Sequence, residues 1–285
     1  MSGRSYMKTI GIIGGMGSLA AARLFERIVI LTKAGCDNEH IPIIIDNNTN
    51  IPDRTEAILN NGDNPVFEMV RSALRLEFTG ADAIVIACNT AHYFYDEIVK
   101  FVKIPVINMV EETAKYIIKS NPSAKCAGLL ATEGTCKSGI YKKVFEKYGL
   151  KLAVPEAEEQ QYITEMIYDI KSSRESINPE NTIKVVSALR KRGAEVIILG
   201  CTELPIAFDM FDICSSYVDS LEVLAISAIA YAGKDIRYDK IIKGMRMEAK
   251  CLGDVYENSK YDSCSTVCSI GAAGNAADEC AAGGL

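Results

Sequence analysis

The chain has 285 residues, 48% of them hydrophobic and 24% charged, an ordinary composition for a globular protein of one large or two modest domains. Its net charge of −6 at pH 7 argues against a nucleic acid or an anionic membrane as partner. No apolar run reaches the roughly 18 residues that a membrane-spanning helix requires, so we expect no membrane partner.

The N-terminal stretch MSGRSYMKTIGIIGG lacks the basic region, apolar stretch and small-residue cleavage site of a signal peptide, so we expect a cytoplasmic protein. In a reducing cytosol the ten cysteines are interpreted as thiols rather than disulfides. Only two histidines are present, His40 and His92, which nearly excludes a histidine-rich metal site.

Short runs rich in Val, Ile and Leu recur along the chain and predict buried strands. The runs lie at 9–13, 41–45, 83–87, 106–107, 126–130 and 196–199. Between them, apolar residues recur at helical spacing. Short apolar strands that alternate with amphipathic helices are typical of parallel sheets with helices on both faces, so the sequence predicts an α/β fold.

Two segments of the first half correspond to two segments of the second. GIIGGMG (11–17) matches GLLATEG (128–134), and GADAIVIACNT (80–90) matches GAEVIILGCTE (193–203). The similar spacing predicts a duplicated unit. We therefore expect two pseudo-symmetric domains, 7–103 (completed by a helix at about 219–232) and 104–218, with the active site in the cleft between them.

The final segment, 233–285, loses the apolar periodicity and becomes rich in small residues, which predicts a poorly ordered extension. Its four cysteines lack the paired C-x2-C spacing of a zinc site, so we expect no metal there. They are Cys251, Cys264, Cys268 and Cys280.

Each half carries a cysteine where a buried strand ends, Cys88 in the first and Cys201 in the second. The polar residues that follow them (Asn89 and Thr90; Thr202) are good helix N-caps, and a thiol ahead of a helix start is expected to have a pKa lowered toward neutrality. Two such thiols suggest one substrate carbon between them, with a proton taken from one face and another returned to the opposite face.

Two cations are candidates for carboxylate recognition. Arg54 follows a Pro-Asp turn at the expected C-terminal edge of a sheet, and Lys171 lies one residue beyond the apolar stripe of a predicted helix. The turn GIIGGMG is not a dinucleotide fingerprint, and we interpret Gly14, Gly15 and Gly17 as allowing close approach of a small ligand. His92 is interpreted as structural or supporting.

These residues resemble the aspartate/glutamate racemase family of cofactor-independent two-cysteine enzymes. Collinear matches extend over roughly residues 7 to 232: IGIIGGMG, HIPIIIDNNTNIPDRT, ACNTAHYFYDEI, IPVINMVEET, GLLATEGT, SGIY and LGCTELP. The aspartate racemase branch fits best, because the glutamate branch is expected to open with an Asp-Ser-Gly-rich turn and to carry His where Glu203 follows Cys201-Thr202.

The resemblance implies that Cys88 and Cys201 are the two acid/bases and that Lys171 contacts a side-chain carboxylate. It implies further substrate contacts at Asp53, Arg54, Thr55, Asn89, Thr90 and Ala91. It also implies a homodimer, a small amino-acid dicarboxylate as substrate, and no cofactor. The chain departs from the family at Ser18, where many relatives have Pro, and in the cysteine-bearing tail.

The function expected is racemisation of L- and D-aspartate by 1,1-proton transfer between two cysteines, without pyridoxal phosphate or metal. Three alternatives stay open. They are a broad-specificity or glutamate-preferring racemase, a diacid decarboxylase or cis-trans isomerase of the same superfamily, and a non-enzymatic dicarboxylate-binding or thiol redox-sensing protein.

Overall fold

The computed structural model describes residues 7–172, 177–213, 216–242 and 245, and within these it contains two four-stranded sheets with parallel pairing throughout. The first sheet has the order β2-β1-β3-β4 and the second the order β6-β5-β7-β8. The strands are β1 Ile10–Gly14, β2 Ile43–Asn47, β3 Ala83–Ile86, β4 Val106–Ile107, β5 Cys126–Ala131, β6 Lys151–Ala153, β7 Val196–Gly200 and β8 Val218–Asp219.

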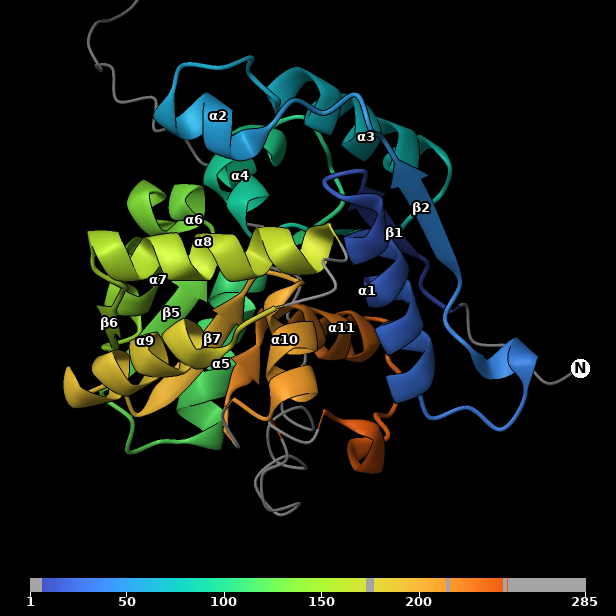
Figure 1. Cartoon of the computed structure of the whole chain (residues 1–285). Helices are drawn as coiled ribbons and strands as arrows, with labels where there is room; N and C mark the ends of the chain where they lie inside the picture. Colours follow the sequence, from blue (N-terminus) through green and yellow to red (C-terminus); the bar gives the residue numbers. More distant parts are fainter. Residues whose placement is uncertain (1–6, 173–176, 214–215, 243–244, 246–285) are drawn as a thin grey trace, which may run out of the picture.

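Helices connect and cover these strands (Figure 1). The α-helices are α1 Ser18–Leu31, α2 Arg54–Leu59, α3 Val66–Phe78, α4 Tyr95–Ile98, α5 Met109–Ser120, α6 Glu133–Ser138, α7 Ile140–Lys147, α8 Ala157–Lys171, α9 Glu180–Lys191, α10 Leu204–Phe211 and α11 Ser220–Tyr231. The described part of the chain also contains the short 3-10 helices η1 Asp37–Glu39, η2 Thr90–Phe94 and η3 Tyr238–Lys240.

The predicted α/β class and its two parallel sheets are confirmed. A central strand of each sheet is buried along its whole length, AIVI of β3 and VIILG of β7, because helices lie on both faces. The two sheets have the same strand order, with the first strand of each half between the second and third. This repetition brings the ends of β3 and β7, which precede Cys88 and Cys201, to equivalent positions.

Helix α11 joins the two halves. Every residue from Ser220 to Ile229 is buried, which explains why the segment has no amphipathic pattern in sequence. The helix packs against both α1 and α5, as Figure 1 shows for α1. One continuous hydrophobic core consequently includes α1, α5, α11 and the second sheet.

Two predicted boundaries need correction. Strand β4 pairs with β3, so the first sheet extends to Ile107 rather than ending by 103. Residues 233–242, which we expected in a poorly ordered extension, pack onto the body: Ile236 bridges to Thr32, and Ile241 is buried. The rest of the tail from 246, with its four cysteines, lies outside the described residues.

Candidate active site

Both candidate cysteines line one cavity of about 200 Å³ at the carboxyl ends of the central strands. Residues from both halves form its walls, including α2 and the Cys88 turn from the first half, and α8 and the Cys201 turn from the second. The predicted site residues that line it are Cys88, Cys201, Asp53, Arg54, Thr55, Asn89, Thr90 and Lys171. Ala91 does not line it, because this residue is fully buried in the smaller hydrophobic cluster of the first half.

The turn after Cys88 is held by the second half of the molecule. We expected Asn89 and Thr90 to cap a helix with their side chains, but η2 begins without a side-chain cap. The Asn89 amide instead contacts Ser220 and Tyr141, and the Thr90 hydroxyl lies 3.0 Å from that of Thr132. The capping prediction is wrong because these side chains are committed to the other half.

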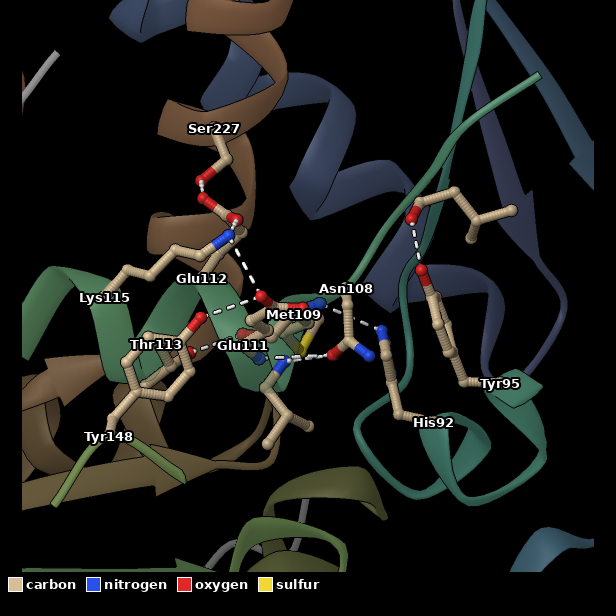
Figure 2. A network of polar contacts seen from close by, with 12 residues as sticks. His92, Tyr95, Asn108, Met109, Glu111, Glu112, Thr113, Lys115, Tyr148 and Ser227 are labelled. Carbon is tan, nitrogen blue, oxygen red and sulfur yellow. Dashed lines mark hydrogen bonds and ion pairs between the residues drawn. The ribbon is translucent and has the colours of Figure 1, made fainter. Parts of the chain in front are cut away.

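His92 holds the same turn through two hydrogen bonds, of which Figure 2 shows the one from Met109. Its Nε2 accepts from the backbone N–H of Met109 at 3.1 Å, which leaves Nδ1 to donate to the carbonyl of Cys88 at 2.9 Å. Burial lowers the pKa of His92 to about 4. The imidazole is therefore neutral at physiological pH and joins the end of β3 to the start of α5, in agreement with the structural role expected for it.

A carboxylate that the sequence analysis did not single out for chemistry lies beside Cys201. Cys201 Sγ donates to Glu203 Oε2 at 2.9 Å, and the hydroxyl of Thr202 donates to the same oxygen at 3.0 Å. The sequence signal was available, since an acidic residue two positions after a cysteine at a strand end is within reach of the sulfur. Pro205 occupies the first turn of α10, where its missing N–H removes no intrahelical hydrogen bond.

The thiol pKa of Cys201 is shifted opposite to our expectation. Burial raises it well above its ordinary value, and the charge and hydrogen bond of Glu203 raise it further, while Lys171 opposes the change. Cys201 is therefore a protonated thiol that donates to Glu203.

The two candidate cations differ in how freely they can bind an anion. The Arg54 guanidinium donates from Nη1 to the carbonyl of Pro52 and from Nη2 to that of Met16, both at 2.9 Å. Its buried Nε has no hydrogen-bond partner among the described residues. Lys171 ends α8 with its Nζ 5.6 Å from the ring centre of Tyr168. Burial lowers the pKa of Lys171, but Glu203 and the two thiols outweigh it, so the net pKa is raised.

A family model for Asp/Glu/hydantoin racemases matches residues 13–228. The chain belongs to this family. It is 29% identical over 224 residues to the broad-specificity amino-acid racemase RacX of Bacillus subtilis, covering 78% of this chain and 96% of RacX. The family resemblance inferred from sequence is thereby confirmed.

Solved structures of similar fold include an aspartate racemase and an aspartate racemase homologue, in agreement with the family match. The aspartate racemase of Picrophilus torridus is 31% identical with a TM-score of 0.70, covering 81% of this chain and 97% of that one. An aspartate racemase homologue from Pyrococcus horikoshii is 26% identical with a TM-score of 0.67, covering 80% and 100%. The chain is therefore an isomerase of the racemase type.

The glycine turn of this racemase-family chain serves packing more than ligand approach. A Cβ on Gly15, whose φ is +87°, would come within 2.2 Å of the carbonyl oxygen of Asn48, and one on Gly14 would come within 2.6 Å of Ala21. Gly17 has open space around it. We expected all three to admit a ligand, but two of them are approached by the chain itself.

The positions of the His, Cys, Asp and Glu side chains show whether the described residues could bind a metal ion. Within the described ranges, no group of three or more His, Cys, Asp or Glu side chains is arranged to hold a metal ion. Nor does any helix of that part of the chain combine the length and apolarity needed to cross a membrane.

Proposed function

We propose that the protein interconverts L- and D-aspartate by a two-base proton transfer between Cys88 and Cys201, without an organic cofactor or metal. The observation that carries this proposal is the single small cavity lined by both cysteines and by Arg54 and Lys171. Its volume of about 200 Å³ suits a small metabolite better than a drug-sized ligand. The similarity to an aspartate racemase over 97% of that enzyme's length gives further support.

In the proposed mechanism, the thiolate of one cysteine removes the α-proton, so that the C–H bond breaks and an S–H bond forms. The electron pair stays on the α-carbon and its carboxylate. The opposite thiol then donates its own proton to the other face and becomes the thiolate. Because the Cys201 pKa is raised, we assign the acid role to Cys201 for one enantiomer, with the roles of the two cysteines exchanged for the other.

Substrate orientation is assigned to the two cations and to the side chains of the Cys88 turn. Arg54 keeps a buried Nε that has no partner among the described residues, and Lys171 stands at the end of α8 near both thiols. We assign Lys171 to the side-chain carboxylate of aspartate, because a charge-assisted contact there distinguishes aspartate from a neutral amino acid. Asp53 caps α2 by accepting from the backbone N–H of Glu56 at 2.9 Å, so we assign it to shaping the loop.

A broad-specificity racemase is the second candidate, and one observation favours it. The cavity is lined by four acidic residues, Asp53, Glu56, Glu133 and Glu203, against the two cations Arg54 and Lys171. This balance gives no excess of positive charge for a second carboxylate. The similarity to RacX, a broad-specificity enzyme, points in the same direction.

Chiral chromatography tests the proposal directly. Purified protein is incubated without added cofactor with L-aspartate, L-glutamate or L-alanine, and the D-enantiomers are measured. We expect the fastest racemisation with aspartate, and in D2O the product should carry α-deuterium. Cys88→Ala and Cys201→Ala should each abolish racemisation; full activity in either variant rules out the two-base scheme, and equal rates on all three substrates favour the broad-specificity candidate.

A further inference from the structure

Three buried side chains form a hydrogen-bonded bridge between the two strand ends that precede the cysteines. Tyr141 OH donates to Asn89 Oδ1 at 2.5 Å, and Asn89 Nδ2 donates to Ser220 Oγ at 3.0 Å. Ser220 Oγ lies 3.0 Å from the carbonyl of Leu199 and 3.2 Å from Asn89 Oδ1. Ser220 carries one hydroxyl hydrogen, and Asn89 Nδ2 already donates to its oxygen, so we place this hydrogen on the shorter contact, to the carbonyl of Leu199.

The bridge connects the chemistry of the two halves. Asn89 follows Cys88 directly, and Leu199 lies in β7 two residues before Cys201. The three hydrogen bonds therefore form one chain of donors and acceptors. It leads from α7 to the Cys88 turn, then to the first residue of α11, and ends on β7, the strand that precedes Cys201. Asn89, Tyr141 and Ser220 are at most 4% exposed, so water does not compete for these contacts.

We infer that this bridge fixes the separation of the two thiols, and that Ser220 and Tyr141 are positioning residues for racemisation. The inference rests on the proposed two-cysteine function. Neither residue lines the cavity, so both act through Asn89 and β7 rather than on the substrate. Proton abstraction and delivery on opposite faces require both sulfurs within reach of one carbon, and a displacement of about 1 Å reduces such a rate by about 100-fold.

Ser220→Ala tests the inference, and the same helix provides a matched control. Ser227 is also a fully buried serine of α11, and its hydroxyl donates to Glu112 at 3.0 Å, remote from the cavity. Ser227→Ala removes the same group from the same helix. We expect kcat of Ser220→Ala to fall about 10- to 100-fold with KM unchanged, and Ser227→Ala to retain both constants.

Deuterium incorporation gives a readout that a general loss of packing would not change. When the second thiol is displaced, the carbanion made by the first is more often reprotonated on its original face. In D2O, the ratio of deuterium in recovered L-aspartate to D-aspartate formed should therefore rise in Ser220→Ala and stay at the wild-type value in Ser227→Ala. Equal kcat and equal ratios in the two variants would overturn the inference.

Tyr141→Phe covers the case in which Ser220→Ala does not fold. It deletes only the phenol–amide contact and leaves the Ser220–Leu199 bond in place, so we expect the same change in kcat and deuterium ratio, but smaller. Wild-type behaviour of a folded Tyr141→Phe would also overturn the inference. A wild-type protein that racemises no amino acid refutes the proposed function instead, so the two failures are distinguishable.

Discussion

At the scale of single residues, Glu203 is the charged group in direct contact with the Cys201 thiol, and its carboxylate accepts from the sulfur at 2.9 Å. Burial is the largest cause of the raised Cys201 pKa, and Glu203 is the next. Glu203→Gln keeps a polar group of similar size but removes the charge. The Cys201 pKa should then fall, while burial keeps it above its ordinary value.

This change is measurable in the pH dependence of racemisation. In the proposed mechanism Cys201 must be protonated to act as the acid, so its ionisation should form the alkaline limb of the kcat/KM profile. We expect that limb to move to lower pH in Glu203→Gln. Glu133→Gln is the matched control, because Glu133 lines the same cavity but pairs with Lys137. An unmoved limb in Glu203→Gln would show that Glu203 does not control this thiol.

Lys171 carries the predicted preference for a second carboxylate. Lys171→Met keeps the apolar stem and deletes the charge, which removes a charge-assisted hydrogen bond contributing about 1.5–3 kcal/mol. The kcat/KM for aspartate should fall by about 10- to 100-fold, whereas that for alanine should change little. Equal losses on both substrates would contradict the assignment of Lys171 to the side-chain carboxylate.

The sequence located the cysteines but not the use of their neighbours. Strand ends and the internal repeat depend on local apolar runs, so Cys88 and Cys201 could be assigned to one cavity. Asn89 and Thr90 were assigned to caps because local pattern favours them there, yet their partners Ser220 and Thr132 are distant in sequence. Such non-local hydrogen bonds leave no periodic signal.

At the scale of the elements, the strands that the sequence did not predict also depend on distant partners rather than on a local pattern. The edge strands β6 and β8 have the sequences KLA and VD, so each includes a charged residue and lacks the apolar run that marks the equally short edge strand β4. They pair only because β5 and β7 present open edges. Helix α11 was anticipated at about 219–232 and spans Ser220–Tyr231, since its long apolar run is a strong signal.

His92 links two elements, and its protonation should couple their packing to pH. Its pKa is about 4 when folded, against 6.5 for an ordinary histidine exposed to water, so the unfolded chain binds this proton first as pH falls. The stability that neutral His92 contributes is complete above pH 6.5 and is lost between pH 6.5 and 4, to a total of about 3 kcal/mol.

The comparison of wild type with His92→Gln isolates this effect. Burial raises the pKa of Asp219 to about 7, and stability from that group is lost as pH rises, which opposes the His92 slope in the same range. Urea unfolding should show His92→Gln less stable at pH 7, with the gap narrowing toward pH 4. Parallel curves for wild type and His92→Gln would contradict this account.

At the scale of the whole molecule, one buried ion pair fastens α11 to α1. Arg27 donates to both carboxylate oxygens of Glu222 at 2.7 Å, and the Glu222 side chain is fully buried. Glu222 also accepts from the backbone N–H of Ile242, and Arg27 donates to the carbonyl of Lys240. The pair thus holds the first helix, the last helix and the segment after it in one body.

Arg27→Met should lower the free energy of unfolding, because it removes the ion pair that holds α1 and α11 together. Removing one partner leaves an uncompensated buried carboxylate, which costs about 3–5 kcal/mol of the free energy of unfolding. Arg192→Met provides the control, because Arg192 is 30% exposed and its pairs with Glu156 and Glu159 lie at the surface, where loss costs at most about 1 kcal/mol.

The double variant Arg27→Met/Glu222→Leu separates charge from packing, because it removes both ions and fills the space with apolar groups. Its free energy of unfolding in urea should exceed that of Arg27→Met alone. A double variant that is less stable than the single one would show that the contacts of Glu222 with the segment after α11 matter more than its pairing with Arg27. The halves would then be fastened by that segment rather than by the ion pair.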